Sequence, residues 1–384
     1  MPARSRLIEM NMHMERALEL AQRATGLSDP NPRVGCLLVG ADGTVLGQGH
    51  TQMAGGPHAE VMALRDARER GNAVQGATAY VTLEPCSHQG RTGPCCDALI
   101  AAGIQRVVAT QTDPNPLVSG QGFARLRAAG LAVELLPADH PQAIASRELN
   151  IGFFSRMVRK TPWVRLKIAA SLDGKTALPN GASQWITSAE ARTDGHAWRA
   201  RASAVLTGIG TVLQDRPRLD VRLVETSRQP HLVVVDSALQ TPLDSPVFLP
   251  GRTLLIYAAQ EDEAKAAALT AQGATVIYLP GRAADGRPTG KVDLAALLRD
   301  LGQREINELH VEAGHKLNGS LVREGLVDEF LVYLAPKLLG QGADMAHFGP
   351  LTELSQALNL RFLSSTLVGP DMRLLARVTG RDDF

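Results

Sequence analysis

The feature that most constrains the fold is a set of potential metal ligands spread along one stretch of the chain. His58 is followed two residues later by Glu60, and two Pro-Cys pairs come after them, at Pro85-Cys86 and Pro94-Cys95. One histidine and two cysteines fill three positions of a tetrahedral zinc and leave the fourth for water, as in catalytic zinc sites. A carboxylate that does not bind the metal is free to carry protons. The sequence therefore predicts a catalytic zinc with Glu60 beside it.

Simpler interpretations remain open for single residues in this stretch. A His-x-Glu pair at a helix start is often an exposed polar pair, and a cysteine is often only a small apolar core residue. His88 is an alternative metal ligand, and Cys96 adjoins Cys95 and competes with it for the same role. Cys36 lies in an apolar run, so we interpret it as a core residue. The order of the motifs favours the catalytic zinc over a structural zinc or no metal.

The H-x-E and Pro-Cys motifs together are the signature of zinc-dependent nucleobase deaminases. That signature has two residues between its cysteines, whereas eight residues separate Cys86 from Cys95. The intervening loop is rich in hydrogen-bond donors. We expect it to hold a polar, anionic group near the metal.

Length, charge and composition limit the number of domains, the kinds of partner and the location of the protein. A length of 384 residues favours two domains, and a formal net charge of +1 offers no broad field for a polyanion, so we expect no nucleic-acid partner. The first 14 residues lack the apolar run of a signal peptide, and no stretch approaches the roughly 20 apolar residues of a membrane span. Four cysteines, two of them assigned to zinc, indicate a reducing compartment. We predict a soluble cytoplasmic protein without a membrane partner.

Hydrophobic periodicity predicts an α/β domain over residues 1–150, followed by a second α/β domain over 151–384. Residues 137–159 read as a linker with a helical middle, and 280–290 as a surface loop. In the first domain we expect helices over 12–25, 59–70, 121–129 and from Cys95, and strands over 34–39, 45–49, 78–83, 106–110 and 131–135. In the second we expect strands over 164–170, 204–207, 231–236, 253–258, 275–279, 308–312, 330–334 and 373–378, and helices over 189–201, 261–271, 294–301 and 317–324.

Seven motifs in the expected order resemble the bifunctional riboflavin-biosynthesis protein family, across nearly the whole chain. Three are similar to its deaminase half in addition to the His-Ala-Glu motif, and four to its reductase half. The motifs are Ser28–Gly35, Glu84–Cys95, Asp113–Pro116, Lys167–Thr176, Ser183–Thr187, Leu206–Asp215 and Val311–Gly314.

The resemblance implies two consecutive reactions. The first domain, a three-layer α/β/α unit like cytidine deaminase, would use zinc to deaminate 2,5-diamino-6-(5-phosphoribosylamino)pyrimidin-4(3H)-one. The second, similar to dihydrofolate reductase, would use NADPH to reduce the ribosyl group of 5-amino-6-(5-phosphoribosylamino)uracil to ribityl. The family also implies a homo-oligomer, either a dimer or a tetramer.

The resemblance also assigns roles to individual residues. In the deaminase it selects Cys95 over Cys96, because the ligand directly follows the proline, and gives His58 and Cys86 as the other ligands and Glu60 as the catalytic acid and base. Candidates for holding the pyrimidine and its ribose phosphate are Asn31, His50, His88 and Arg91. In the reductase the substrate positions are Lys167, Ser183, Arg199, Leu219, Arg222 and Glu312. The NADPH positions are Ala169, Trp185, Thr211, Asp215, Ser237, Gly314, His315, Lys316, Leu317, Asn318, Gly319 and Ser320.

The chain departs from the family at Arg216, where an Asp-Asp-Pro stretch is usual. This leaves a second acidic role without a candidate. Three rival hypotheses stay open: a deaminase acting on cytidine or a tRNA adenosine, a second domain that only binds nucleotides with a structural zinc in the first, and a protein in which one half alone is active.

Overall fold

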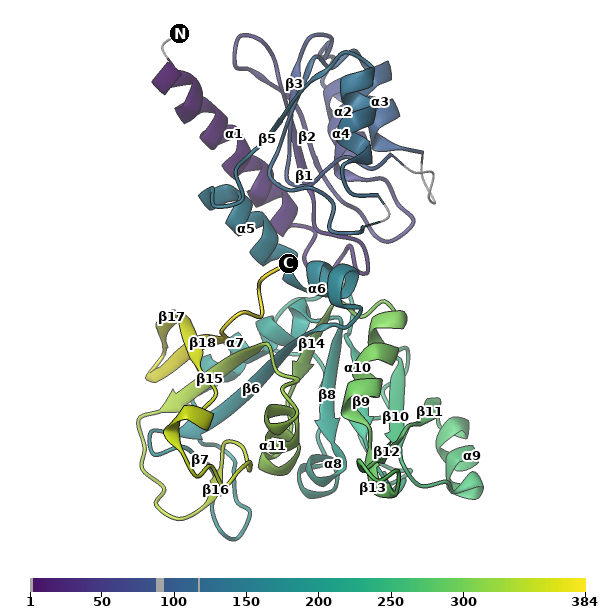
Figure 1. Cartoon of the computed structure of the whole chain (residues 1–384), viewed down its shortest axis with the longest axis vertical. Helices are drawn as coiled ribbons and strands as arrows, with labels where there is room; N and C mark the ends of the chain where they lie inside the picture. Colours follow the sequence, from purple (N-terminus) through teal and green to yellow (C-terminus); the bar gives the residue numbers. More distant parts are fainter. Residues whose placement is uncertain (1–2, 88–92, 117) are drawn as a thin grey trace. The chain divides into compact units, whose positions relative to one another are not determined.

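The computed structural model describes residues 3–87, 93–116 and 118–384, and the chain divides into two compact units. The first comprises Met1–Arg159 with Phe384, and the second comprises Lys160–Asp383. Each unit contains its own sheet covered by helices (Figure 1). The prediction of two α/β domains is therefore confirmed.

The segment 137–159, predicted as a linker, is part of the first unit. It forms helices α5 (Pro141–Leu149) and α6 (Ile151–Arg159). Phe153 and Phe154 of α6 are buried in the same apolar cluster as residues of the first sheet. The observed boundary follows Arg159 rather than residue 150, because α6 buries its aromatic side chains in the first unit.

The first unit is built on a five-stranded sheet with the order β2-β1-β3-β4-β5. β1 pairs antiparallel with β2 and β3, whereas β3, β4 and β5 are parallel. The predicted hairpin therefore forms one side of a mixed sheet. The strands are β1 (Gly35–Val39), β2 (Val45–His50), β3 (Thr78–Val81), β4 (Arg106–Ala109) and β5 (Ala132–Leu135).

Side chains alternate between the two faces of this sheet, so each face carries its own layer of helices. Leu37 and Val39 of β1 share an apolar cluster with α1 (Ala3–Gln22) and α5. Cys36 and Leu38 belong to a second cluster with the helices of the opposite face. Those helices are α2 (Ala59–Glu69), α3 (Cys95–Ala101) and α4 (Gln121–Ala128) (Figure 1).

The second unit has a nine-stranded sheet with the order β11-β10-β9-β8-β14-β6-β15-β18-β17. Neighbours are parallel from β11 to β15, and β18 and β17 extend the sheet antiparallel. The carboxyl ends of the parallel strands therefore lie along one edge. The strands are β6 (Trp163–Ser171), β8 (Ala204–Gly208), β9 (His231–Val235), β10 (Leu254–Ala258), β11 (Ala274–Tyr278), β14 (Glu308–Val311), β15 (Glu329–Ala335), β17 (Leu360–Val368) and β18 (Asp371–Val378).

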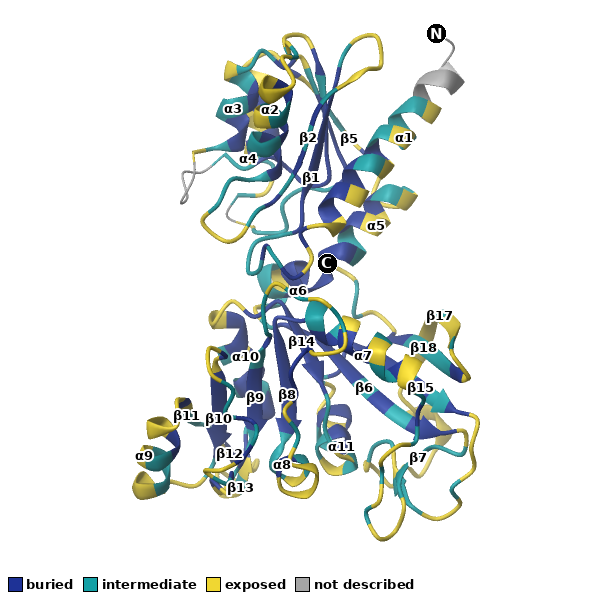
Figure 2. Ribbon diagram, turned by 180° about the vertical axis from the view of Figure 1, so that it is seen from behind, coloured by how far each residue is buried: buried dark blue, intermediate teal, exposed yellow. Residues whose placement is uncertain are grey.

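Helices cover both faces of this sheet. On one face, leucines of α10 and α11 pack with Leu166, Leu206 and Val311 in the largest apolar cluster. The central strands are buried along most of their length (Figure 2). The helices are α7 (Ala189–Arg201), α8 (Ile209–Asp215), α9 (Glu263–Ala271), α10 (Leu294–Gln303) and α11 (His315–Arg323), with a short 3₁₀ turn at Leu354–Gln356.

The other face of the sheet carries buried charges under α7. Arg165 of β6 donates hydrogen bonds to Glu308 at 2.9 Å and to Glu329 at 2.6 Å. Arg377 of β18 donates to Glu329 at 3.0 Å, and none of these four side chains is more than 3% exposed. Trp198 of α7 stacks against Arg165, whose guanidinium carbon lies 4.5 Å from the ring centroid. This face is therefore held by ion pairs rather than by an apolar core alone.

The segment 280–290 lies at the surface as predicted, but the prediction that it is a loop is wrong. The segment contributes to a hairpin of β12 (Pro280–Arg282) and β13 (Pro288–Val292). A second small pair, β7 (Lys175–Ala177) with β16 (Ala343–Asp344), and the edge strand β17 also lie outside the predicted strands. These strands are short or mostly exposed, so their sequences lack the sustained alternation of apolar and polar residues that predicts a strand.

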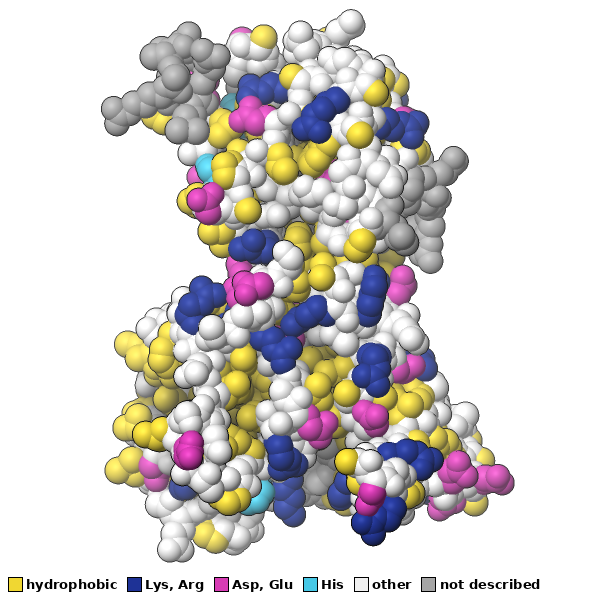
Figure 3. Space-filling model, viewed as in Figure 1, with side chains coloured by type: hydrophobic (Ala, Val, Ile, Leu, Met, Phe, Trp, Pro, Cys, Tyr) yellow, Lys and Arg dark blue, Asp and Glu magenta, His cyan; other side chains and the backbone are white. Residues whose placement is uncertain are grey.

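Charged side chains of both signs are interspersed over the visible face of each unit (Figure 3). Among the residues that the structure describes, no helix combines the length and the apolar character that crossing a membrane requires.

Candidate active sites

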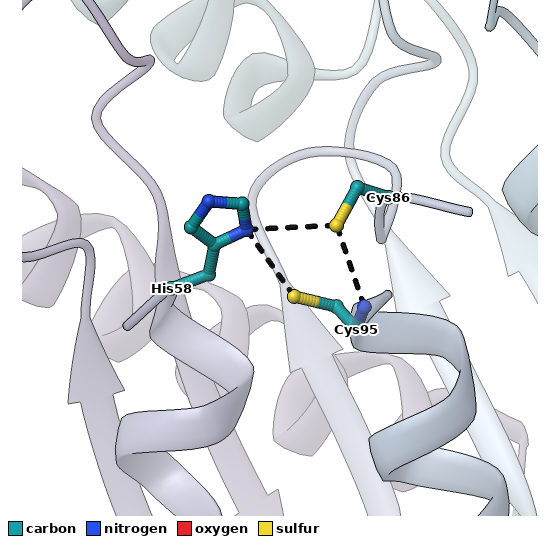
Figure 4. A group of neighbouring side chains, drawn as sticks. All are labelled: His58, Cys86 and Cys95. Carbon is teal, nitrogen blue, oxygen red and sulfur yellow. Dashed lines mark hydrogen bonds between the residues drawn. The ribbon is translucent and has the colours of Figure 1, made fainter. Parts of the chain in front are cut away.

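Three residues predicted as metal ligands converge in the first unit. His58 immediately precedes α2, Cys86 follows β3, and Cys95 is the first residue of α3. The His58 Nδ1 atom lies 3.5 Å from Cys86 Sγ and 3.3 Å from Cys95 Sγ, and the three potential ligand atoms lie within 4.8 Å of one another (Figure 4). The fold therefore brings together ligands that are up to 37 residues apart in the sequence.

Cys96 does not compete for the metal. Its Sγ atom points away from the cluster and donates to the backbone oxygens of Pro85 at 3.1 Å and Gly122 at 3.5 Å. Cys36 is buried in the apolar cluster of β1, as predicted. His88 lies outside the described residues. Within the described part of the chain, the group able to hold a metal therefore comprises His58, Cys86 and Cys95.

This donor set fits zinc. Two thiolates and one imidazole are ligands that Zn²⁺ favours, and three protein ligands leave a fourth position for water. The Cys86 sulfur also accepts a hydrogen bond from the Cys95 backbone amide at 3.3 Å. That bond fixes one thiolate at the start of α3.

The two thiols differ strongly in pKa in the metal-free protein. A hydrogen bond from Cys95 lowers the pKa of Cys86 to about 4 against the opposing effect of burial. The same hydrogen bond, burial and the nearby Glu60 raise the pKa of Cys95. Cys95 therefore keeps its proton at neutral pH in the metal-free protein. Metal binding must release this proton.

Glu60 lies in the first turn of α2 and is only 3% exposed. It is not a member of the metal-ligand group among the described residues. Burial, together with the negative charge of Cys86, raises the pKa of Glu60 to about 7. The carboxyl group can therefore gain or lose a proton near neutral pH, as a general acid and base must.

The other deaminase candidates are placed only in part. His50 is the last residue of β2 and pairs with Gly35, and its pKa is lowered by burial and by the charge of Arg23. Asn31 follows α1 and donates its backbone amide to Ser28. Arg91, like His88, lies outside the described residues. A groove of about 750 Å³ borders the metal ligands and is lined by Gly55, Pro57, Val61, Arg65, Gly93, Pro94, Asp97 and Ala98.

In the second unit, Lys167, Arg199 and Glu312 form one cluster. Arg199 binds both carboxylate oxygens of Glu312, and Lys167 Nζ lies 3.8 Å from Glu312 Oε2. Burial alone would raise the pKa of Glu312, but the charges of Arg199 and Lys167 outweigh burial and lower it. Burial lowers the pKa of Lys167, although Glu312 partly compensates. The cluster combines a fixed carboxylate with an ammonium group that gives up its proton more readily than an exposed lysine.

Arg199 also connects this cluster to Arg222. It donates to the backbone oxygen of Asp220, whose carboxylate accepts from Arg222 at 2.8 Å and forms an ion pair with Arg218 at 2.7 Å. Arg222 is held further by His196, whose Nδ1 accepts the Arg222 amide. The sequence missed Asp220, because its partners become apparent only once Arg199 is placed beside it.

Two further substrate candidates have no side-chain bond to this cluster. Leu219 adjoins Asp220, but its side chain is buried in an apolar cluster and its backbone oxygen accepts from Arg252 at 3.0 Å. Ser183 is half-buried in the loop before α7. Arg216, the departure from the family pattern, forms an exposed ion pair with Asp244.

Several cofactor candidates lie at the carboxyl ends of neighbouring parallel strands. Ala169 lies near the end of β6, Thr211 lies in the first turn of α8 after β8, Ser237 follows β9 and Gly314 follows β14. A Cβ added at Gly210 would meet nothing within 4 Å, and one at Gly314 only Thr211, at 3.9 Å. Open space beside backbone amides at this edge fits a dinucleotide.

The remaining cofactor candidates divide into accessible and internal residues. The Trp185 ring is 61% exposed and stacks with Arg192, and Asp215 ends α8 at the surface. His315, Lys316, Leu317 and Ser320 are at least partly exposed on α11. Asn318 and Gly319 instead face the interior: Asn318 donates to Met345, and a Cβ at Gly319 would lie 1.8 Å from the His347 oxygen.

Comparisons with known proteins identify the families to which both units are similar. Residues 162–374 match the family model described as the RibD C-terminal domain, and residues 8–111 match the cytidine and deoxycytidylate deaminase zinc-binding region. The riboflavin biosynthesis proteins RibD of Escherichia coli and Aquifex aeolicus are 45% and 40% identical over 377 and 360 residues. These alignments cover 94% of this chain in each case and 97% and 96% of those proteins.

Solved structures show the same similarity over the whole chain. Acinetobacter baumannii RibD has a TM-score of 0.84 at 38% identity, covering 97% of this chain and 99% of its own. A Thermotoga maritima protein described as a diaminohydroxyphosphoribosylaminopyrimidine deaminase/5-amino-6-(5-phosphoribosylamino)uracil reductase has a TM-score of 0.82 at 31% identity, covering 96% and 99%. With the model of the RibD reductase domain matching more than half of its length, the chain belongs to the RibD family of bifunctional deaminase/reductases of riboflavin biosynthesis.

Proposed function

We propose that the first unit deaminates 2,5-diamino-6-(5-phosphoribosylamino)pyrimidin-4(3H)-one at a zinc site. We further propose that the second unit uses NADPH to reduce the ribosyl group of 5-amino-6-(5-phosphoribosylamino)uracil to ribityl. The observation that carries the proposal is the convergence of His58, Cys86 and Cys95 within 4.8 Å beside a buried Glu60 that is not a ligand. The structural similarity to the Thermotoga maritima deaminase/reductase supports the choice of substrates.

In the deaminase, His58, Cys86 and Cys95 would hold the zinc, which supplies the Lewis acidity that activates a water molecule near neutral pH. Glu60 takes a proton from the attacking water and delivers it to a ring nitrogen. It then moves the proton of the added hydroxyl group to the amino group, which leaves as ammonia. A pKa of about 7 suits both transfers, because neither protonation state is strongly disfavoured at neutral pH. Burial of Glu60 also keeps bulk water away from the proton.

In the reductase, NADPH supplies the hydride, and the open edge beside Gly210 and Gly314 would receive its pyrophosphate. Lys167 and Glu312 face the ribosyl group, where Lys167 holds the proton that the reduced oxygen needs. Arg222 binds the substrate phosphate, since a guanidinium group pairs with phosphate through two parallel hydrogen bonds. The Asp220 carboxylate orients that guanidinium group from behind.

A cytoplasmic location and a homo-oligomer, either a dimer or a tetramer, are part of the proposal. The zinc site requires two reduced cysteines, which favours a reducing compartment. Association is supported by β17, an edge strand of the second sheet on which Phe362 is 70% and Leu367 is 68% exposed. Light scattering after size-exclusion chromatography measures the assembly directly.

The test is metal analysis combined with both half-reactions on one purified sample. We expect about one zinc per chain, ammonia release from the diaminopyrimidine but not from cytidine, and NADPH oxidation with the deaminated product. Replacing NADPH with NADH tests the cofactor. Ammonia release from cytidine, or zinc content without any deamination, would refute the proposed deaminase.

A further inference from the structure

We propose that Glu84 is a positioning residue of the deaminase, which fixes the metal ligand Cys86 and the Asp113–Pro116 motif through the backbone amides around the start of α4. The inference rests on the metal-binding role proposed for Cys86. Glu84 belongs to the Glu-Pro-Cys motif, yet it is neither one of the proposed metal ligands nor the residue that transfers protons.

Both oxygens of the Glu84 carboxylate are occupied by backbone amides. Oε2 accepts from Asp113 at 3.0 Å and from Gly120 at 2.9 Å. Oε1 accepts from Gly122 at 2.8 Å and from Phe123 at 3.2 Å. The residue is 5% exposed, so the four hydrogen bonds replace the water that burial removes.

Two of these donors are amides that a helix leaves unpaired in its first turn. Gly122 and Phe123 are the second and third residues of α4, and the residue before the helix, Gly120, has no side chain that could cap them. Glu84 therefore caps α4 from another element, and its negative charge lies at the positive end of the helix.

The backbone that follows Glu84 is held in place by α3 and α4. The Pro85 oxygen accepts from Cys96 Sγ, and the Cys86 oxygen accepts from the Cys96 amide at 3.2 Å. The Ser87 oxygen accepts from Arg125 of α4 at 3.1 Å. A Cβ at Gly122 would lie 2.1 Å from the Pro85 oxygen, so α4 lies directly against the chain that carries Cys86.

The same carboxylate also binds the Asp113–Pro116 motif. Asp113, the first residue of this motif, and Gly120, which follows it, donate to the same oxygen of Glu84. One carboxylate therefore ties Asp113 and Gly120 to the residue two positions before a metal ligand. Without the carboxylate, the positions of Cys86 and of the Asp113–Pro116 motif would both be less well fixed.

The test compares Glu84→Gln with Glu134→Gln, a matched change at a half-exposed glutamate of β5 in the same unit. The glutamine keeps the shape but presents an NH₂ group to two of the four amides. In the full chain, we expect zinc affinity, measured by competition with a chelator, to fall about 10- to 100-fold, as for residues that orient metal ligands. Amide exchange at Gly122 and Phe123 should accelerate. Glu134→Gln should match the wild type.

The thermal transition of the first unit reports whether that unit is folded, and reductase activity of the same samples shows that the second unit is unaffected. Should Glu84→Gln not fold, Glu84→Asp keeps the charge on a shorter side chain. This variant should bind zinc more weakly and raise the KM of the deaminase for its substrate, while reductase activity stays intact. Wild-type zinc affinity and KM in the folded variant, or a loss of stability alone, would overturn the inference. A wild-type protein that binds no zinc would instead refute the proposed deaminase, so the two failures are distinguishable.

Discussion

Glu312 receives two hydrogen bonds from Arg199, at 2.7 Å from Nε and at 3.0 Å from Nη2. The side chains are 9% and 13% exposed, so this bidentate pair is shielded from water. Lys167 approaches the same carboxylate at 3.8 Å. The reductase site thus contains a carboxylate that Arg199 orients and that Arg199 and Lys167 together keep charged.

Arg199→Met should cost about 3 kcal/mol of unfolding free energy, because removing one partner of a buried ion pair leaves the other charge uncompensated. Reductase activity should fall with it, while deamination should persist. Urea unfolding and both assays measure these effects. The matched control is Arg216→Met, whose exposed pair with Asp244 should contribute less than about 1 kcal/mol. Equal costs for the two variants would contradict the role of Arg199.

Glu60→Gln should lower kcat of the deaminase by about 10²- to 10⁴-fold, the usual contribution of a general acid and base. Zinc content and reductase activity should be unchanged, because Glu60 is not a member of the ligand group. Atomic absorption and the two assays test this. Glu69→Gln, at an exposed position of the same helix, controls for the loss of one negative charge. Loss of zinc from Glu60→Gln would show that Glu60 is a ligand.

Chelation of the metal should abolish deamination and leave reduction intact. The thermal transition of the first unit should also shift to lower temperature, because zinc binding stabilises only a folded site. Adding zinc back should restore both properties. A reductase that fails together with the deaminase after chelation would argue against two separate sites.

The second unit should lose stability as the pH falls from about 6.5 towards 4. Burial is the main cause that lowers the pKa of His196 to about 4 and that of His310 to about 3. In this window the unfolded chain binds protons that the folded chain excludes, so unfolding becomes easier by roughly 1.4 kcal/mol per pH unit for each proton. His310→Leu should reduce the dependence of the unfolding free energy on pH by about one proton's contribution.

Tryptophan fluorescence measures this transition selectively. Trp163, Trp185 and Trp198, the only tryptophans in the chain, all belong to the second unit. A His310→Leu variant whose stability depends on pH as steeply as the wild type would contradict the assignment of that proton to His310.

The metal ligands and most central strands could be predicted from sequence for the same reason. Their residues carry local signals, namely a Pro-Cys pair, a His-x-Glu triplet or a run of buried β-branched residues. Glu84 has no such signal, because its four partners lie 29 to 39 residues further along the chain. Its capping role exists only in the folded unit.

Two elements differ from the prediction for different reasons. α6 has an amphipathic sequence, and the interpretation of 137–159 as a linker overlooks that its apolar residues, Phe153 and Phe154 among them, pack into the first unit. β17 leaves Phe362 and Leu367 exposed, so no buried face marks it as a strand. Its place in the sheet depends on pairing with β18, which a single sequence does not contain.

The paired charges of Arg165, Glu308, Glu329 and Arg377 link four neighbouring strands beneath α7. If β6 slid by one residue against β14 or β15, Arg165 would turn to the apolar side of the sheet, and Glu308 and Glu329 would each lose one of their two arginine partners. A shifted register would therefore bury the charge of Arg165 without a partner, a cost in free energy that an all-apolar layer would not impose. The ion pairs thus select one alignment of these strands in the second unit.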